Sequence, residues 1–165
     1  MNENALTRIV VGLDGSPGAQ EALAYAIRVA GPADAEIVAV AVIEPVPPVY
    51  ETMRTYPTEF PAEADVDELE GELRGEWCAP LAESGLRWRS KVRVGRPASE
   101  IDRVARDEGA DLIVVCRRGR GSLAELLLVS VSHELSHTAH APIMIVSRQP
   151  EARSEPARSD IRTTS

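Results

Sequence analysis

Residues 111–146 read DLIVVCRRGRGSLAELLLVSVSHELSHTAHAPIMIV, and this stretch decides the expected fold. Its continuous apolar run from Leu112 to Cys116 is typical of a strand buried on both faces, as in a parallel sheet. Helical patterning follows, with Ser122 and Ser130 as expected helix starts, and a second apolar run spans Ile143 to Val146. The stretch therefore predicts a strand, a loop, a helix and another strand.

The loop after the first of these strands is both permissive in its backbone and strongly cationic. Arg117, Arg118 and Arg120 alternate there with Gly119 and Gly121. Glycine permits backbone conformations that other residues avoid, and successive backbone amides can hold an anion. The loop therefore predicts an anion-binding turn.

The preceding part of the chain alternates between strand and helix patterns. Apolar or alternating runs predict strands at 8–13, 37–43 and 86–94, the last a half-exposed edge strand, and helices are expected at 17–30, 62–83 and 98–108. Pro80 is expected to distort the last turn of the second helix. Five strands alternating with four helices predict the α/β class. The expected fold is a doubly wound five-stranded parallel sheet in three α/β/α layers, with strand order 3-2-1-4-5.

One folded domain is expected over residues 6–148, because a chain of 165 residues can bury a sizeable core. Residues 149–165 are rich in Arg, Glu, Ser, Pro and Thr, which predicts a disordered tail. Residues 44–61 carry five prolines and no helical period. They indicate a long connection that is either a lid or a mobile loop.

Composition argues against several classes of protein. A net charge of −8 disfavours sequence-independent binding of nucleic acid, which needs a basic surface. No apolar run approaches the ~20 residues of a membrane-spanning helix, and the N-terminus lacks the pattern of a secretory signal. A cytoplasmic protein without a membrane partner is therefore expected. Cys78 and Cys116 lack metal-ligand spacing and are interpreted as reduced structural thiols.

The expected strand order opens a crevice where the winding reverses, between the first and fourth strands. Asp14-Gly15-Ser16 would form one wall, with a carboxylate suited to hydroxyls or ring nitrogens. Residues 117–122 would form the other wall, with arginines and backbone amides suited to phosphate. A nucleotide fits this pair of walls. Asp14 has a second interpretation, in which it only caps the turn before the first helix.

Three segments carry a resemblance to a known family. VGLDGS at 11–16, VRVGRPASEI at 92–101 and the stretch 111–146 resemble the universal stress protein family over about residues 6–148. The resemblance implies an adenine-nucleotide-hydrolase-like fold and a homodimer formed through the last strand, Ile143 to Val146. One subclass of the family binds ATP, so the resemblance also implies binding of ATP. A divalent cation that accompanies the ATP is a further expectation.

That subclass is marked by glycine, two residues, glycine, nine residues, then glycine and a hydroxyl residue. Here the corresponding positions are Cys116, Gly119, Val129 and Ser130, so two of the three glycines are replaced. The branched side chain of Val129 would project where phosphate approaches the backbone. Carried over, the resemblance places Gly12, Asp14 and Val42 on the adenosine side and Gly119, Ser130 and Val131 on the phosphate side, and the charge of Arg117 would add to the phosphate side.

Two hypotheses remain open from these residues. The first is a regulatory or sensing protein that binds ATP, and the second is a nucleotide-free dimeric interaction protein of the stress response. No combination of base, nucleophile and orienting group is visible, so no catalytic residue is assigned and an enzyme is not expected.

His133, Glu134 and His137 form an H-E-x-x-H pattern, which in zinc hydrolases places two ligands beside a general base. The extended zinc-protease pattern fails, because His140 and Ile143 occupy the positions of its glycine and third histidine. A zinc hydrolase is therefore the remote alternative. Adventitious metal binding by His133, His137 and His140 is a second alternative. Histidines on a helix surface are the simpler interpretation, and no metal site is assigned.

Overall fold

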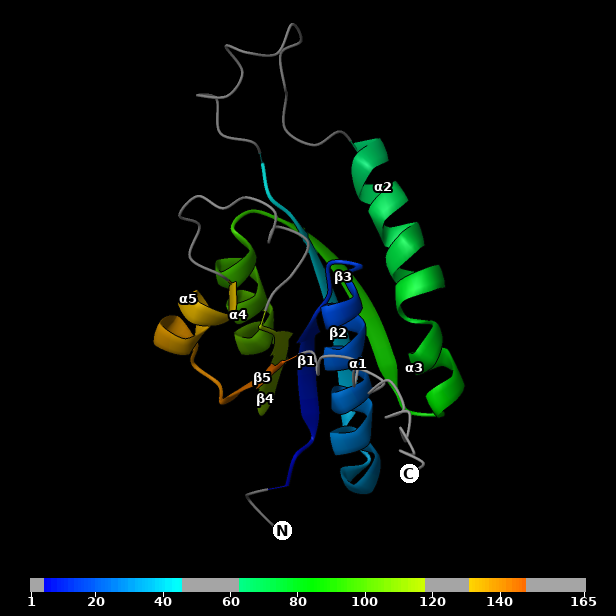
Figure 1. Ribbon diagram of the computed structural model, residues 1–165, viewed down its shortest axis with the longest axis vertical. Coiled ribbons are helices and arrows are strands. Elements are labelled where there is room, and N and C mark those ends of the chain that lie inside the picture. The colour runs from blue at the N-terminus through cyan, green and yellow to red at the C-terminus, as the bar shows by residue number, and fades with distance from the viewer. Residues whose placement is uncertain (1–4, 46–62, 118–130, 148–165) are drawn as a thin grey trace, which may run out of the picture.

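The computed structural model describes residues 5–45, 63–117 and 131–147, which form one parallel sheet with helices on both sides (Figure 1). The strands are β1 (Arg8–Gly12), β2 (Glu36–Ile43), β3 (Trp88–Val94), β4 (Leu112–Cys116) and β5 (Ile143–Val146). Their order in the sheet is β3-β2-β1-β4-β5, and every neighbouring pair is parallel. The predicted fold class and strand order are confirmed.

The helices form the two outer layers. They are α1 (Pro17–Ala30), a short 3-10 turn η1 (Gly31–Ala33), α2 (Glu63–Glu72), a wide turn η3 (Leu73–Trp77), α3 (Ala79–Ser84), α4 (Pro97–Glu108) and α5 (Val131–Thr138). In Figure 1, α2 and α3 lie to the right of the sheet, α1 lies in front of its centre, and α4 and α5 lie to its left. The residues of α1, η3 and α3 pack on one face of the sheet and those of α4 and α5 on the other. Each side encloses its own apolar cluster.

The alternation of side chains along β1 explains these two clusters. Ile9 and Val11 pack beneath α1, whereas Val10 packs beneath α4, and all three side chains are fully buried. A central strand that is apolar at every position can fill both clusters at once. This explains why continuous apolar runs, rather than alternating ones, predicted β1, β2 and β4.

The helix expected at 62–83 is broken into three pieces. Its regular part ends at Glu72, and η3 then widens the backbone, so that the amide of Cys78 donates to the carbonyl of Leu73 at 2.9 Å. Pro80 lies in the first turn of α3, where a backbone N–H has no helical acceptor. Proline, which lacks this N–H, is therefore tolerated there. The predicted distortion is present, but it falls before Pro80 rather than in the last turn.

The edge strand β3 is half-exposed, as expected, and its basic residues lie against acidic residues of α4. Arg89 Nη2 lies 2.6 Å from Glu108 Oε2 and Arg89 Nε lies 2.7 Å from Glu36 Oε1. Donation from Lys91, and then from Arg89, outweighs the effect of burial and holds the pKa of Glu108 below its ordinary value. These ion pairs form a charged network that joins β3 to β2 and to the end of α4.

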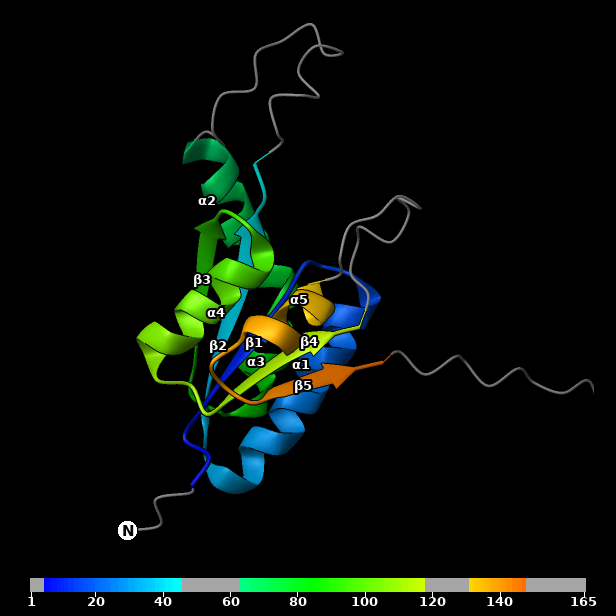
Figure 2. The same cartoon turned by 90° about the vertical axis from the view of Figure 1, so that its left-hand side faces the viewer.

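The other edge of the sheet is β5, next to β4 (Figure 2). Ile145 of β5 is 43% exposed. Among the described residues, Ile145 and Val94 are the two large apolar side chains that are exposed. Within the described ranges, no helix has both the length and the apolar character to cross a membrane. Residues 46–61 of the expected connection at 44–61 lie outside the described residues, as does the expected tail at 149–165.

Candidate functional site at the carboxyl edge of the sheet

The predicted walls of the crevice lie at one edge of the sheet. β1 and β4 pair directly, with Val10 opposite Ile113 and Val11 opposite Val114. Because both strands run in the same direction, the residues that follow Gly12 and Cys116 emerge at the same edge. The turn at Asp14 and the beginning of the arginine loop, Arg117, therefore start side by side.

The first wall is a tight turn that is built by its own side chains. The amide of Ser16 donates to Asp14 Oδ1 at 3.0 Å, and Ser16 Oγ accepts from the amide of Ala19 at 3.2 Å as the N-cap of α1. Gly15 has a φ of +71°, a region that side chains other than glycine rarely adopt. The interpretation of Asp14 as a turn-forming residue is confirmed, and its role toward a ligand stays a prediction.

Gly12 has a packing role that the sequence did not reveal. A β-carbon at this position would lie 2.9 Å from Ile101 Cδ1 and 3.2 Å from Val115 Cγ1. Glycine therefore allows α4 to approach the end of β1. No local pattern could have shown this contact, because Ile101 lies far along the chain.

Two further predicted residues belong to the same side of the sheet as Gly12. Val42 near the end of β2 and Val131 at the start of α5 are half-buried and pack against the apolar cluster under α4 and α5. The structure thus brings Gly12, Val42 and Val131 onto one side of the carboxyl edge. Such an arrangement offers apolar surface of the kind that a planar base requires.

The second wall is described only at its two ends. Gly119, Val129 and Ser130 lie outside the described residues, as do Arg118 and Arg120. At one end, the exposed Arg117 donates its amide to the carbonyl of Val146 at 2.8 Å. Its own carbonyl accepts from the buried Ser132 Oγ at 3.2 Å. The ends of β4 and β5 and the start of α5 are therefore tied together.

The two cysteines differ in their surroundings. Cys78 is buried, and burial raises the pKa of its thiol to about 11, so it stays protonated and unreactive near neutral pH. Cys116, at the first glycine position of the ATP subclass, is half-buried at the carboxyl end of β4. Neither forms a disulfide, in agreement with the interpretation of both as reduced thiols.

The H-E-x-x-H residues lie on α5. The rings of His133 and His137 have centroids 4.8 Å apart, and Glu134 Oε1 lies 2.9 Å from Arg96 Nη2. Among the residues that the structure describes, no group of three or more His, Cys, Asp or Glu side chains is placed to hold a metal ion. The structure adds no third zinc ligand in those residues, and the carboxylate of Glu134 is engaged by Arg96.

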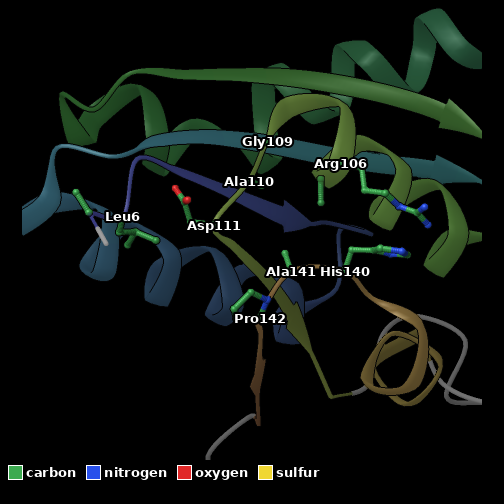
Figure 3. A pocket seen from close by; sticks show the side chains of 10 residues that line it. Leu6, Arg106, Gly109, Ala110, Asp111, His140, Ala141 and Pro142 are labelled. Carbon is green, nitrogen blue, oxygen red and sulfur yellow. The ribbon is translucent and has the colours of Figure 1, made fainter. Parts of the chain in front are cut away.

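A cavity lies at the opposite end of the strands, away from the Asp14 turn and Arg117. This cavity of about 490 Å³ is lined by segments that precede β1, β4 and β5, including Leu6, Asp111 and Pro142 (Figure 3). Arg106 and His140 close its other end (Figure 3). It lies at the amino ends of the strands, so it is not the crevice between Asp14 and Arg117.

A buried carboxylate orients Arg106 and His140. Asp102 accepts from Arg106 Nε at 3.1 Å and from the amide of His140 at 3.0 Å. Burial of Asp102 opposes its charge most strongly. The donors on His140 and Arg106 together outweigh burial and hold the pKa of Asp102 below its ordinary value. The group therefore ties α4 to the turn before β5.

Comparison with known proteins gives one consistent family. A sequence model described as the universal stress protein family matches residues 5–147. Universal stress protein MJ0531 of Methanocaldococcus jannaschii is 33% identical over 88% of this chain and 85% of its own length. The match spans nearly all of the described residues.

Two solved structures share the fold. A universal stress protein in complex with cAMP is 24% identical, with a TM-score of 0.66 over 86% of this chain and 97% of its own. The universal stress protein of Archaeoglobus fulgidus in complex with dAMP is 21% identical, with a TM-score of 0.62 over 86% and 98% of the two chains. At these identities the likeness shows the fold.

Proposed function

Because the chain belongs to the universal stress protein family, we propose that it is a regulatory or sensing protein that binds an adenine nucleotide between the carboxyl ends of β1 and β4. The observation that carries this proposal is the shared edge of the sheet on which the Asp14 turn and Arg117 emerge. One wall supplies a carboxylate and backbone polar groups, and the other begins a run of arginines. The base, ribose and phosphates of a nucleotide need these kinds of group.

The titles of two structural neighbours support adenine nucleotides as the ligand class. One neighbour is in complex with cAMP and another with dAMP. Both ligands are monophosphates, so adenine recognition in this fold does not require a triphosphate. In this chain Val129 replaces a glycine of the phosphate motif. The chain is therefore suited to a ligand with few phosphates at least as well as to ATP.

In the proposed complex, Gly12, Asp14 and Val42 line the adenosine side and Arg117, Gly119, Ser130 and Val131 line the phosphate side. Val42 would offer apolar contact to the base, and Arg117 would offer charge to the phosphates. No residue is given a catalytic role. A divalent cation would enter only with the phosphates of ATP, as their counter-ion.

A nucleotide-free dimeric interaction protein is the second candidate, and the exposed edge strand favours it. An apolar strand at a sheet edge presents unpaired backbone groups, and pairing with a second copy covers them. Ile145 of β5 is 43% exposed on that edge. A dimer through Ile143–Val146 is compatible with either candidate, whereas an empty crevice is compatible only with the second.

Retained ligand separates the two candidates. The purified full chain, gently denatured, is analysed by mass spectrometry for released nucleotides, and its melting temperature is measured with millimolar ATP, ADP and AMP. Released adenine nucleotide together with a rise in melting temperature supports the proposal. An empty protein whose melting temperature does not respond to any of the three contradicts it and favours the nucleotide-free candidate.

A further inference from the structure

Two histidines on α5 have no part in the proposed nucleotide site. His133 and His137 are four residues apart, which places them on the same face of the helix. Both side chains are exposed, and their ring centroids are 4.8 Å apart with an interplanar angle of 72°. Two imidazoles at this spacing are a ready pair of metal ligands, because imidazole suits Zn²⁺, Ni²⁺ and Cu²⁺.

The separation of the rings fits a shared metal ion. A zinc–nitrogen bond of about 2.0–2.1 Å places a bound metal about 3.2 Å from the centre of each imidazole ring. Ligand–metal–ligand angles between a right angle and the tetrahedral angle then put the two ring centres about 4.5 to 5.2 Å apart. The observed 4.8 Å falls within this range. The spacing of four residues on α5 therefore lets the two rings approach to the centre-to-centre distance that chelation requires.

We propose that His133 and His137 form a two-imidazole site for a borderline divalent transition metal ion such as Zn²⁺ or Ni²⁺, with water in the remaining coordination positions. The site goes beyond nucleotide binding and does not depend on it. Mg²⁺ prefers oxygen ligands and retains its waters, so the site would not take the ion that accompanies a nucleotide.

The net charge of the chain and the dipole of α5 favour a cation at this site. The surroundings of Glu134 are nevertheless not those of a hydrolase. The whole chain carries a net charge of −8, and His137 lies in the last turn of α5, where the helix dipole favours positive charge. Glu134, the residue that would act as general base in a zinc hydrolase, is instead paired with Arg96 at 2.9 Å. The described part of the chain places no third side-chain ligand at the pair. The metal is therefore a structural clamp across one turn.

Such a clamp would act on a short helix in a sensitive position. α5 has eight residues, a length at which helices have little stability of their own. It begins at Val131 and carries Ser132, whose hydroxyl donates to the carbonyl of Arg117. A metal ion that holds His133 and His137 together would stabilise the first turns of α5, which contact Arg117 through Ser132. A ligand that binds only the folded state at 100 times its dissociation constant raises the folded-to-unfolded ratio about 100-fold.

Metal titration of the full chain, without a histidine tag, tests the site. Isothermal titration with NiCl₂ and with ZnCl₂ is compared among the wild type, His133→Ala, His137→Ala and His140→Ala. His140→Ala is the matched control, because His140 is also an exposed histidine but lies outside α5, against Asp102. The melting temperature is measured in parallel with metal, with EDTA and with MgCl₂.

We expect one Ni²⁺ or Zn²⁺ per wild-type or His140→Ala chain, with a melting temperature that rises with metal and does not respond to Mg²⁺. Each α5 variant should bind at least tenfold more weakly and lose the rise, while keeping its melting temperature in EDTA. Unchanged affinity in His137→Ala, or an equal loss in His140→Ala, would overturn the proposal. One metal per two chains would also overturn it, because the ion would then bridge two copies.

Discussion

The backbone of Gly15 lies against the indole of Trp77, so closely that a β-carbon at residue 15 would come within 2.5 Å of Trp77 Cζ2. Trp77 is 5% exposed and ends the wide turn η3, whereas Gly15 belongs to the turn that begins with Asp14. The segment after α2 therefore supports the first wall of the proposed nucleotide site. Crowding at Gly15 should disturb both folding and the ligand turn.

Gly15→Ala should lower the free energy of unfolding by about 2–4 kcal/mol, because it combines a positive φ with a collision against a buried ring. Gly85→Ala is the matched control, since Gly85 has a φ of +72° and no atom within 4 Å of the added carbon. It should lose only about 1 kcal/mol from backbone strain. Urea denaturation measures both. Equal losses in the two variants would show that Trp77 does not constrain the turn.

Val129→Gly should strengthen binding of adenine nucleotide, with a larger gain for ATP than for AMP. The glycine restores backbone access for phosphate oxygens at a position where the ATP subclass has glycine. A gain of about tenfold for ATP corresponds to roughly 1.4 kcal/mol. Calorimetric titration of the wild type, Val129→Gly and Val131→Ala with ATP and AMP measures the gain. Val131→Ala is the comparison, because it changes a valine on the other side of Ser130. If Val129→Gly gains affinity for neither nucleotide, the steric argument is contradicted.

The proposed homodimer should depend on the β5 edge. Ile145→Glu is expected to give a monomer in light scattering after size exclusion, because a charge on the exposed face of an edge strand opposes pairing with a second copy. Val94→Glu is the matched control: Val94 is 39% exposed, but it ends β3 at the other edge of the sheet. That variant should keep the dimer. A wild type that is already monomeric, or a Val94→Glu variant that dissociates equally, would contradict the prediction.

Glu108 should make the stability of the protein depend on acid pH. Lys91 and Arg89 hold the pKa of its carboxyl below the ordinary value of 4.5. A carboxyl with a lowered folded-state pKa contributes stability that is complete above its unfolded pKa and is lost as the pH falls through the folded pKa. The contribution of Glu108 is therefore present at neutral pH and is lost progressively below about pH 4.5.

Glu108→Gln should lower the free energy of unfolding at pH 7 by about 1–3 kcal/mol, since it leaves the charges of Arg89 and Lys91 against a neutral group. It should also flatten the fall in stability below about pH 4.5, because the lowered pKa of the Glu108 carboxyl no longer contributes. Glu83→Gln, an exposed position on α3, is the control and should change little. Parallel pH curves for wild type and Glu108→Gln would refute the assignment.

Much of the fold was predictable, because it depends on patterns that are local in the sequence. The apolar runs at 9–11 and 113–115 predicted strands buried on both faces, and their alternation with helices predicted a parallel, doubly wound sheet with right-handed crossovers. The contacts of Gly12 with Ile101 and of Gly15 with Trp77 were not predictable, because each joins residues that are distant in sequence. The ion pairs of the β3 arginines were not predictable for the same reason, since the acidic partners Glu100 and Glu108 come from a later helix.

The candidate site was predictable in its location rather than in its detail. The point where the winding reverses follows from the strand order, so the meeting of the Asp14 turn with the end of β4 could be derived. The hydrogen bond from Ser16 to Asp14 was one of two interpretations that the sequence left open. The packing role of Gly12 depends on the side chains of α4 and β4, which no local pattern specifies.

Nuclear magnetic resonance titration of the ¹⁵N-labelled chain with AMP and ATP tests the location of the proposed site most directly. Binding at the carboxyl edge predicts that the largest shifts fall on the amides of Gly12, Asp14, Arg117 and Val131. Shifts concentrated instead around Gly109, Asp111 and His140, at the cavity on the opposite edge, or no shifts at millimolar nucleotide, would contradict the account.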